Sequence, residues 1–181
     1  MRCVQVSGLP LRKVGVDGAV RHNMTVFSFV ATASNSGKTT LIEKIVPILK
    51  ARGLRVAVIK HASEGFDLQQ PEVDGYLKSG ADTVIIAGQQ AVAVIKNINE
   101  TPSMEEMQKN IGEMDITIYE GFKADAVNKI EIFRYGVSGV RPLSMDDPSY
   151  IALVTDTKYN VTIPQFELND AVSVAEFIME K

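Results

Sequence analysis

The sequence predicts an α/β fold, a three-layer sandwich in which a mostly parallel sheet has helices on both faces. The first observation is a series of short apolar runs bounded by polar or glycine residues, as in buried strands. The second is that amphipathic stretches of helical periodicity, such as residues 38–52, separate several of these runs. Strands that alternate with helices favour a parallel sheet covered on both sides.

Composition and length restrict the classes of protein that fit. The chain has 181 residues, 45% hydrophobic and 23% charged, which suits one globular domain with a sizeable core. A net charge of -3 gives no basic footprint for nucleic acid or an anionic membrane, and we expect neither as a partner. No apolar run approaches the length of a membrane span and the N-terminus lacks a signal-peptide core, so we expect a cytoplasmic protein.

The stretch of residues 26–42 carries the clearest chemical signal. An apolar strand is followed by a small polar loop and by a helix that starts at Gly-Lys-Thr-Thr. Backbone N–H groups of such a loop and the helix N-terminus bind phosphate oxygens, so this layout is a P-loop and the fold is of the P-loop NTPase type. The predicted phosphate-binding residues are Ser34, Asn35, Ser36, Gly37, Lys38, Thr39 and Thr40.

Several residue types in this loop have a specific task in nucleotide binding. Lys38 would reach the β- and γ-phosphates and is a catalytic candidate, and the Thr39 hydroxyl would bind Mg²⁺. Gly37 lets the backbone approach the phosphates. The consensus P-loop pattern is G-x-x-x-x-G-K-[ST]. Its first glycine is replaced in this chain by Thr32, and threonine disfavours positive φ. We therefore expect a loop that opens differently or a weaker affinity for nucleotide; the alternative is a chance Gly-Lys-Thr at a helix start.

The chain divides into an N-terminal extension, residues 1–24, and a nucleotide-binding domain, residues 25–181. The extension contains a predicted hairpin around Asp17-Gly18. It is expected to be an added edge strand, a dimerisation arm or a poorly ordered tail. The single cysteine, Cys3, provides no internal disulfide and no cysteine zinc cluster.

The domain is expected to begin with a strand over residues 25–32, which leads through the P-loop into the helix at 38–52. Pro47 lies inside that helix and should kink it or remove one hydrogen bond. The next strand, at residues 55–61, is a continuous apolar run, which predicts coverage on both faces.

The remaining elements alternate between helices and strands. Asn169 is expected to cap the last helix, because asparagine is favoured at helix N-caps. The expected elements are a helix at 73–79, two antiparallel strands at 83–87 and 91–95, a helix at 103–112, strands at 115–121, 129–134 and 151–156, an extended segment at 161–166 and a helix at 170–181.

Ligands of open α/β sheets bind at the carboxyl ends of the strands. The P-loop, Lys60-His61, Glu120-Gly121 and Asp156 all lie at the carboxyl ends of predicted strands, so we expect them to converge at one edge. Glu120 has the position of the acid that holds Mg²⁺ or its water, which makes it a catalytic and metal-binding candidate. A solvated acid at a strand end is the alternative, and Asp115, at the other end, is the weaker candidate.

Two further residues of this edge have two open interpretations each. His61 would contact a γ-phosphate or a second ligand, or it is a hydrogen-bonded structural histidine. Asp156 would accept two hydrogen bonds from guanine and so select it over adenine, or it is an ordinary loop acid. In the region after strand 55–61, Asp67 and Asp74 would bind Mg²⁺ through water or are solvated acids.

With these residues in view, the chain resembles the molybdopterin-guanine dinucleotide biosynthesis protein B (MobB) family over residues 26–181. The most specific parts are Lys60-His61 after the second strand and the Glu-Gly-Phe-Lys that starts at Glu120. The other matching parts are residues 34–44, Val58-Ile59, Gly80-Ala81-Asp82, residues 115–119, Lys129-Ile130-Glu131 and Thr155-Asp156.

The resemblance implies a GTP-binding P-loop protein with weak Mg²⁺-dependent GTPase activity at most. Such proteins are accessory factors in attaching GMP to molybdopterin during molybdenum cofactor biosynthesis; they usually form homodimers and work beside the guanylyltransferase. By position, residues 34–40 would bind the phosphates, Thr39 would bind Mg²⁺, Glu120 would have the Walker-B-type role at the metal, and Asp156 would read guanine. Two departures are Thr32, where the family has glycine, and the run from Ala62 to Gly65, where many members carry histidines.

Three other functions are alternatives to this one. A metal-delivery GTPase of the nickel-enzyme type would need cysteine and histidine ligands, and the chain has one cysteine and two histidines. A small-molecule ligase or kinase of the dethiobiotin synthetase type would need a substrate pocket beside Lys38, where Lys60 could serve. A pure interaction module with a vestigial P-loop is compatible with Thr32.

Overall fold

The computed structural model describes residues 24–62, 65, 71–122 and 126–181. The described residues up to His61 and from Gln108 onward form one unit, and those between Ala62 and Met107 form a second. The hairpin predicted around Asp17-Gly18 lies outside the described residues, so the extension stays a prediction. The larger unit contains the P-loop.

A six-stranded sheet is the framework of the larger unit, and every strand pairing in it is parallel. The first strand of the sequence lies near its middle, because the strand order is β2-β5-β1-β6-β7-β8. This sheet confirms the predicted fold class. Its strands are β1 (Thr25–Val30), β2 (Val56–Lys60), β5 (Ile116–Glu120), β6 (Lys129–Phe133), β7 (Tyr150–Thr155) and β8 (Gln165–Glu167).

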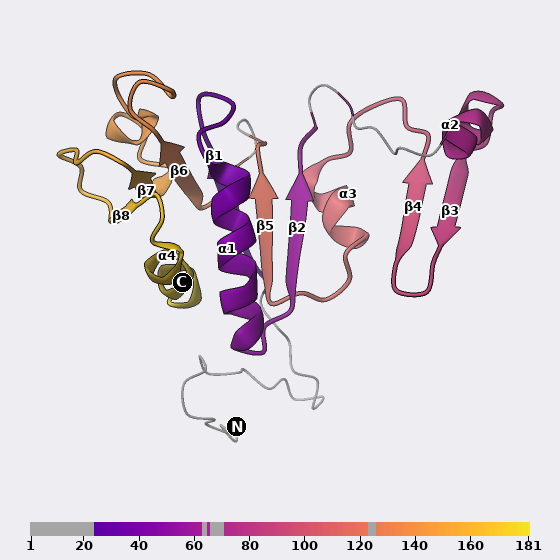
Figure 1. Ribbon diagram of the computed structural model, residues 1–181, viewed down its shortest axis with the longest axis horizontal. Coiled ribbons are helices and arrows are strands. Elements are labelled where there is room, and N and C mark those ends of the chain that lie inside the picture. Colours follow the sequence, from indigo (N-terminus) through magenta and orange to yellow (C-terminus); the bar gives the residue numbers. More distant parts are fainter. Residues whose placement is uncertain (1–23, 63–64, 66–70, 123–125) are drawn as a thin grey trace. The chain divides into compact units, whose positions relative to one another are not determined.

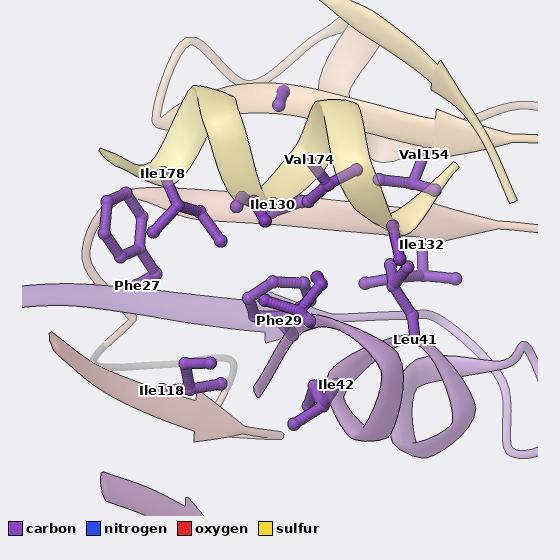
Figure 2. Packing of buried hydrophobic residues seen from close by; sticks show 14 of the residues in the cluster. Phe27, Phe29, Leu41, Ile42, Ile118, Ile130, Ile132, Val154, Val174 and Ile178 are labelled. Atoms are coloured by element: carbon purple, nitrogen blue, oxygen red, sulfur yellow. The ribbon is translucent and has the colours of Figure 1, made fainter. Parts of the chain in front are cut away.

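Two helices pack together on one face of this sheet, α1 (Lys38–Ala51) and α4 (Ala171–Met179) (Figure 1). Alternate residues of a strand point to the same face, so every second residue of the central strands faces these helices. Figure 2 shows the resulting core, with Phe27 and Phe29 of β1 among the side chains of both helices and the neighbouring strands. Its other labelled residues are Leu41, Ile42, Ile118, Ile130, Ile132, Val154, Val174 and Ile178.

Two groups of contacts lie on the opposite face of the sheet. The side chain of Gln108, in helix α3 (Met104–Lys109), hydrogen-bonds Tyr119 of β5. The buried Glu131 of β6 accepts hydrogen bonds from the backbone N–H groups of Leu143 and Ser144, in the 3-10 helix η1 (Leu143–Met145). These contacts cover part of the sheet face opposite α1 and α4.

Strand β2 differs from its prediction. All five of its residues are intermediate or exposed, and Val58 keeps 45% of its side chain accessible. The reason is its position at the edge of the sheet, where it pairs with β5 on one side. The prediction that both faces of this strand are covered is therefore wrong, because a continuous apolar run does not reveal whether a strand is central or at an edge.

The two long helices show one tolerated irregularity and one corrected cap. Helix α1 runs without interruption through Pro47, which has no N–H to donate to the preceding turn. The N-cap of α4 is Asp170, whose carboxylate accepts a hydrogen bond from Ser173 N at 3.0 Å. The prediction of Asn169 as the cap is wrong, because its side-chain oxygen instead accepts from Lys44 Nζ at 3.1 Å.

The smaller unit consists of helix α2 (Pro71–Lys78) and a two-stranded antiparallel sheet, β3 (Thr83–Ala87) and β4 (Val92–Lys96). The predicted antiparallel pairing is confirmed. Ile85 and Val94 are register partners across the pair, and their exposed fractions are 64% and 55%. This hairpin therefore presents apolar side chains on its surface.

Candidate functional site

The P-loop connects the end of β1 to the start of α1 and turns through two left-handed residues. Asn35 has φ 59, and Gly37, the N-cap of α1, has φ 100. Glycine and asparagine are the residues that most readily adopt this conformation. The Lys38 ammonium reaches back over the loop and donates to the Ala33 carbonyl at 3.4 Å. The result is a loop that ends at a helix N-terminus, which is the geometry of a phosphate site.

Thr32 does not create the conflict that its sequence position suggested. The described non-glycine residues with positive φ are Asn35, Phe122 and Asn128, so Thr32 adopts an ordinary backbone conformation. Its hydroxyl donates to the Ser138 carbonyl at 2.6 Å. The loop therefore accommodates threonine at the first glycine position of the pattern without strain in φ.

Glu120 lies at the carboxyl end of β5, next to the start of α1. Its Oε1 accepts a hydrogen bond from Thr39 Oγ1 at 2.5 Å, and its Oε2 lies 3.8 Å from Lys60 Nζ. The sheet register explains this arrangement, because Glu120 is the partner of Phe29 in β1 on one side and of Lys60 in β2 on the other. Only 7% of Glu120 is exposed, so a carboxylate and a hydroxyl are fixed together beside the P-loop.

His61 lies against the same strand end. Its backbone N–H donates to the Glu120 carbonyl at 2.9 Å, and its ring centroid is 5.0 Å from that of Phe122. Gly121 lies between Glu120 and Phe122 in the sequence and has φ 104. A Cβ at Gly121 would lie 3.0 Å from the His61 Cβ. A glycine is therefore needed here for His61 to approach the end of β5.

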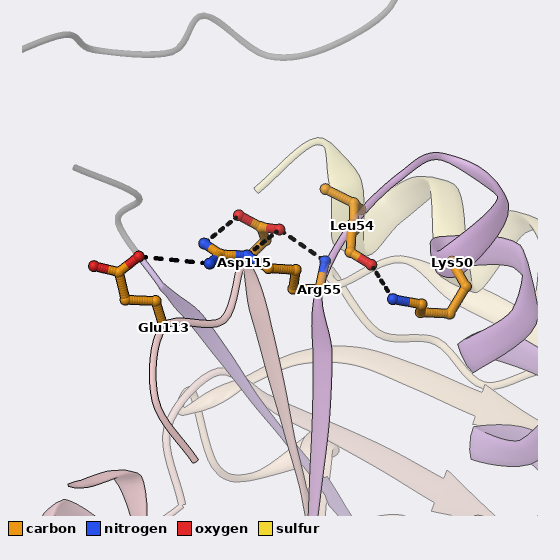
Figure 3. A network of polar contacts seen from close by, with 5 residues as sticks. All are labelled: Lys50, Leu54, Arg55, Glu113 and Asp115. Carbon is orange, nitrogen blue, oxygen red and sulfur yellow. Dashed lines mark hydrogen bonds and ion pairs between the residues drawn. The ribbon is translucent and has the colours of Figure 1, made fainter. Parts of the chain in front are cut away.

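Asp115, the acid at the other end of β5, has structural partners (Figure 3). Its Oδ2 accepts from the backbone N–H of Arg55 at 2.7 Å and from Arg55 Nε at 3.4 Å. Arg55 also contacts Glu113 at 3.5 Å, and the hydrogen bond that Arg55 donates to Asp115 raises the pKa of the arginine. These contacts connect the starts of β2 and β5 at the N-terminal ends of the strands, whereas the P-loop lies at the carboxyl ends.

Asp156 follows β7, which is two strands away from β1 in the sheet. Its Oδ1 accepts from the backbone N–H of Tyr135 at 2.9 Å, and Thr157 Oγ1 lies 3.4 Å away. The structure thus brings Thr39, Lys60-His61 and Glu120 into direct contact, whereas Asp156 contacts the turn that follows β6.

The hydroxyl and amide side chains of the P-loop have different surroundings. Ser34, Asn35 and Thr40 are exposed, whereas Ser36 is fully buried. Among the acids predicted after β2, Asp74 pairs with Lys78 at 2.5 Å within α2, and Asp67 lies outside the described residues.

Ser138 is a residue of this site that sequence reasoning missed. It lies in the turn after β6, and its hydroxyl is 2.8 Å from the hydroxyl of the buried Ser36. Because β6 pairs in parallel with β1, the segments that follow the two strands leave the same edge of the sheet. A hydroxyl in the turn after a predicted parallel strand is the only local signal that could have indicated it.

The residues that the structure describes lack two kinds of feature. Within them there is no group of three or more histidine, cysteine, aspartate or glutamate side chains placed to hold a metal ion. In the same part of the chain, no helix has the length and apolar character required to cross a membrane.

A parallel sheet with this loop between its central strand and the following helix defines a P-loop protein of the α/β class. The sequence profile of one family, described as "MobB: Molybdopterin guanine dinucleotide synthesis protein B", matches residues 26–156. The chain therefore belongs to the MobB family, as its motifs predicted.

Curated relatives match most of the chain. A molybdopterin-guanine dinucleotide biosynthesis adapter protein of Escherichia coli (strain K12) is 36% identical over 160 residues, which are 83% of this chain and 89% of the relative. The adapter protein of the same name from Haemophilus influenzae is 29% identical over 149 residues, covering 80% of this chain and 83% of the relative.

Solved structures agree with the fold. A crystal structure of molybdopterin-guanine biosynthesis protein B has a TM-score of 0.65 and 27% identity, and covers 86% of this chain and 99% of its own. A MobB homologue from Bacillus stearothermophilus has a TM-score of 0.62 over 87% of this chain and 97% of its own, and at 20% identity it supports the fold alone.

Proposed function

We propose that this protein is a GTP-binding adapter in the biosynthesis of molybdopterin guanine dinucleotide, with Mg²⁺-dependent GTPase activity that is weak at most. The observation that carries the proposal is the contact of Thr39 Oγ1 with Glu120 Oε1 at 2.5 Å beside the P-loop. It joins the hydroxyl expected to bind Mg²⁺ to the acid expected to support it.

The phosphates would be bound by the loop itself. Residues 34–40 supply backbone N–H groups at a helix N-terminus, and the Lys38 ammonium is already folded over the loop toward Ala33. A lysine in this position acts as a point charge on the β- and γ-phosphates. His61, held at the end of β5, would contact the γ-phosphate side of the nucleotide.

The donor set fits Mg²⁺. This ion prefers hard oxygen ligands and usually keeps several waters, with one or two protein ligands and the substrate phosphates. Thr39 and Glu120 offer a hydroxyl and a nearly buried carboxylate 2.5 Å apart. When bound, Mg²⁺ would neutralise phosphate charge; Thr39 would be its direct ligand, and Glu120 would orient that hydroxyl or a bound water.

The proposed activity is slow because the site binds and orients without an evident means of activating water. The sequence contains no catalytic glutamine motif and no clear arginine finger of the GTPase type, which are the parts that accelerate hydrolysis in fast GTPases. Arg55 is bound to Asp115 at the opposite edge of the sheet.

Guanine selection is assigned to Asp156. A carboxylate can accept two hydrogen bonds from the N1 and N2 groups of guanine, which adenine cannot supply in that pattern. Asp156 is exposed at the carboxyl end of β7, and its Oδ1 is oriented by the Tyr135 backbone N–H at 2.9 Å. These two features support a base-reading role.

The adapter role rests on the family and on the relatives named as adapter proteins. Its partners would be the guanylyltransferase that attaches GMP to molybdopterin and other proteins of cofactor assembly.

A homodimer is part of the proposal, supported by the exposed apolar pair Ile85 and Val94 on the β3-β4 hairpin. Light scattering of Ile85→Asp tests this contact, with Val172→Asp in α4 as a control at another exposed apolar residue. An unchanged dimer mass of Ile85→Asp contradicts the contact.

Equilibrium binding of GTP, GDP and ATP with Mg²⁺ tests the nucleotide proposal. Lys38→Ala should abolish binding, Lys44→Ala on the outer surface of α1 should not, and Asp156→Ala should equalise GTP and ATP. Absence of binding by the wild-type protein would contradict the proposal and favour an interaction module. Phosphate release only with an added carboxylate or amine acceptor would instead favour the dethiobiotin synthetase type of ligase or kinase.

A further inference from the structure

The turn after β6 contacts the P-loop at both ends of the loop. The Thr32 hydroxyl, at the first position, donates to the Ser138 carbonyl at 2.6 Å. The Ser138 hydroxyl lies 2.8 Å from the hydroxyl of Ser36, the residue before Gly37. One residue of a different segment is therefore bonded to the beginning and to the end of the phosphate-binding loop.

The hydrogens of this cluster have a single consistent order. Ser36 Oγ donates its proton to the Ala33 carbonyl at 2.8 Å, so the Ser138 hydroxyl must donate to Ser36. Ser138 Oγ in turn accepts from the backbone N–H of Arg134 at 3.2 Å. Both serine hydroxyls donate once and accept once, and linked bonds of this kind strengthen one another in a buried site.

Burial makes the arrangement specific. Ser36 is fully buried and Ser138 is 9% exposed, so loss of a partner would leave a polar group without water to replace it. Thr32 is exposed, and its hydrogen bond to Ser138 holds the first residue of the loop in place. A loop held at both ends would keep its N–H groups oriented before phosphate arrives, which reduces the entropy cost of binding.

We propose that Thr32 and Ser138 are positioning residues that hold the P-loop in its phosphate-binding conformation, so that threonine at the first glycine position strengthens nucleotide binding. This inference rests on the proposed nucleotide function. It reverses the sequence-based expectation, in which the same threonine weakens affinity. Restoring the consensus glycine would remove the Thr32 hydroxyl and add backbone freedom to the loop.

The test is the equilibrium dissociation constant of Mg²⁺-GTP for the full-length chain and matched variants. Thr32→Val keeps the shape and removes the hydroxyl, whereas Thr32→Ser keeps the hydroxyl. We expect Thr32→Val, Thr32→Gly and Ser138→Ala each to weaken GTP about three- to tenfold, as expected for the loss of one hydrogen bond, and Thr32→Ser to stay near wild type.

A second readout separates positioning from general damage. The loop contacts phosphates and not the base, so Thr32→Val should weaken GTP, ATP and inorganic triphosphate by the same factor and leave the GTP-to-ATP ratio unchanged. Hydrogen exchange of the amides at residues 33–38 should be faster in Thr32→Val and restored in Thr32→Ser.

The two proposals fail in different ways. If the wild-type protein binds GTP and Lys38→Ala abolishes binding, but Thr32→Val and Thr32→Gly bind as tightly as wild type, the positioning role is overturned and the nucleotide function stands. If Thr32→Gly binds more tightly, the threonine is a weakening substitution. If the wild-type protein binds no nucleotide, both proposals are overturned.

Discussion

Thr39 Oγ1 donates a 2.5 Å hydrogen bond to Glu120 Oε1, and this bond connects two residues separated by 81 positions in the chain. The hydroxyl comes from the first turn of α1 and the carboxylate from the last residue of β5. Parallel pairing of β5 with β1 brings both to the same edge of the sheet. The contact therefore depends on the fold and not on local sequence.

The first prediction concerns this pair. Thr39→Ala and Glu120→Gln should each reduce the gain in GTP affinity that Mg²⁺ provides by about tenfold or more, since a hydrogen bond to a charged group contributes about 1.5–3 kcal/mol. In the double variant, the loss of this Mg²⁺-dependent binding free energy should be smaller than the sum of the losses in the two single variants, because the two groups act together. Titration calorimetry with and without Mg²⁺ measures this, with Glu43→Gln, an exposed acid of α1, as control. Unchanged Mg²⁺ dependence would rule out the assigned roles.

The second prediction concerns Gly121. Gly121→Ala should lower the free energy of unfolding by roughly 1–3 kcal/mol, because alanine is strained at φ 104 and its Cβ would lie 3.0 Å from the His61 Cβ. Gly75→Ala is the control, since Gly75 is helical and has open space around it, and it should be neutral or slightly stabilising. Chemical denaturation compares the two. Equal effects would mean that the approach of His61 does not require glycine.

The third prediction concerns Pro47. Pro47→Ala should raise the free energy of unfolding by roughly 1–3 kcal/mol, because alanine restores a helical hydrogen bond and removes the clash of the ring with the preceding turn. Pro47 is exposed, so the change removes no core contact. Glu43→Ala at an exposed position of the same helix should have little effect. A loss of stability in Pro47→Ala would show that the proline is required for the shape of α1.

The fourth prediction is a pH dependence at the cap of α4. The hydrogen bond from the Ser173 backbone N–H lowers the pKa of the Asp170 carboxyl. A lowered folded-state pKa adds stability above the ordinary aspartate value of about 3.9, and this stability is lost as the pH falls through the folded-state pKa. Asp170→Asn should therefore be less stable than wild type at pH 7, and the difference should shrink below about pH 4.

Thermal unfolding from pH 7 to pH 3 measures that difference. Glu176→Gln, which removes the same charge from an exposed position of α4, is the control and should not reproduce the pattern. A stability difference between wild type and Asp170→Asn that is constant with pH would show that the carboxylate charge does not contribute to the cap.

Much of the fold was predictable because its signals are local. The P-loop layout, the parallel strands and the antiparallel pairing of residues 83–87 with 91–95 were predicted from periodicity and turn residues, and the structure has this pairing with Val92–Lys96. The proximity of Thr39 and Glu120 was also predictable, since parallel strands place their carboxyl ends at one edge.

The predictions that were wrong or incomplete share one physical cause. Tertiary contacts, which the local sequence does not reveal, decide between local alternatives. Asn169 and Asp170 are both good caps, and the contact of Asn169 with Lys44 leaves the role to Asp170. The run Val56-Ala57-Val58-Ile59 has the composition of a central strand but lies at an edge. Ser138 carries no motif, and its importance arises only because β6 is the neighbour of β1.

The position of β1 has a consequence for how the chain is made. This strand is the first described element, yet its partners β5 and β6 begin only at Ile116 and Lys129. At a synthesis rate of about 5–20 residues per second, both edges of this apolar strand stay unpaired for roughly 4 to 17 seconds during translation. The nascent chain is therefore most exposed to aggregation while residues 31–115 are being translated, and chaperone binding should peak in that interval.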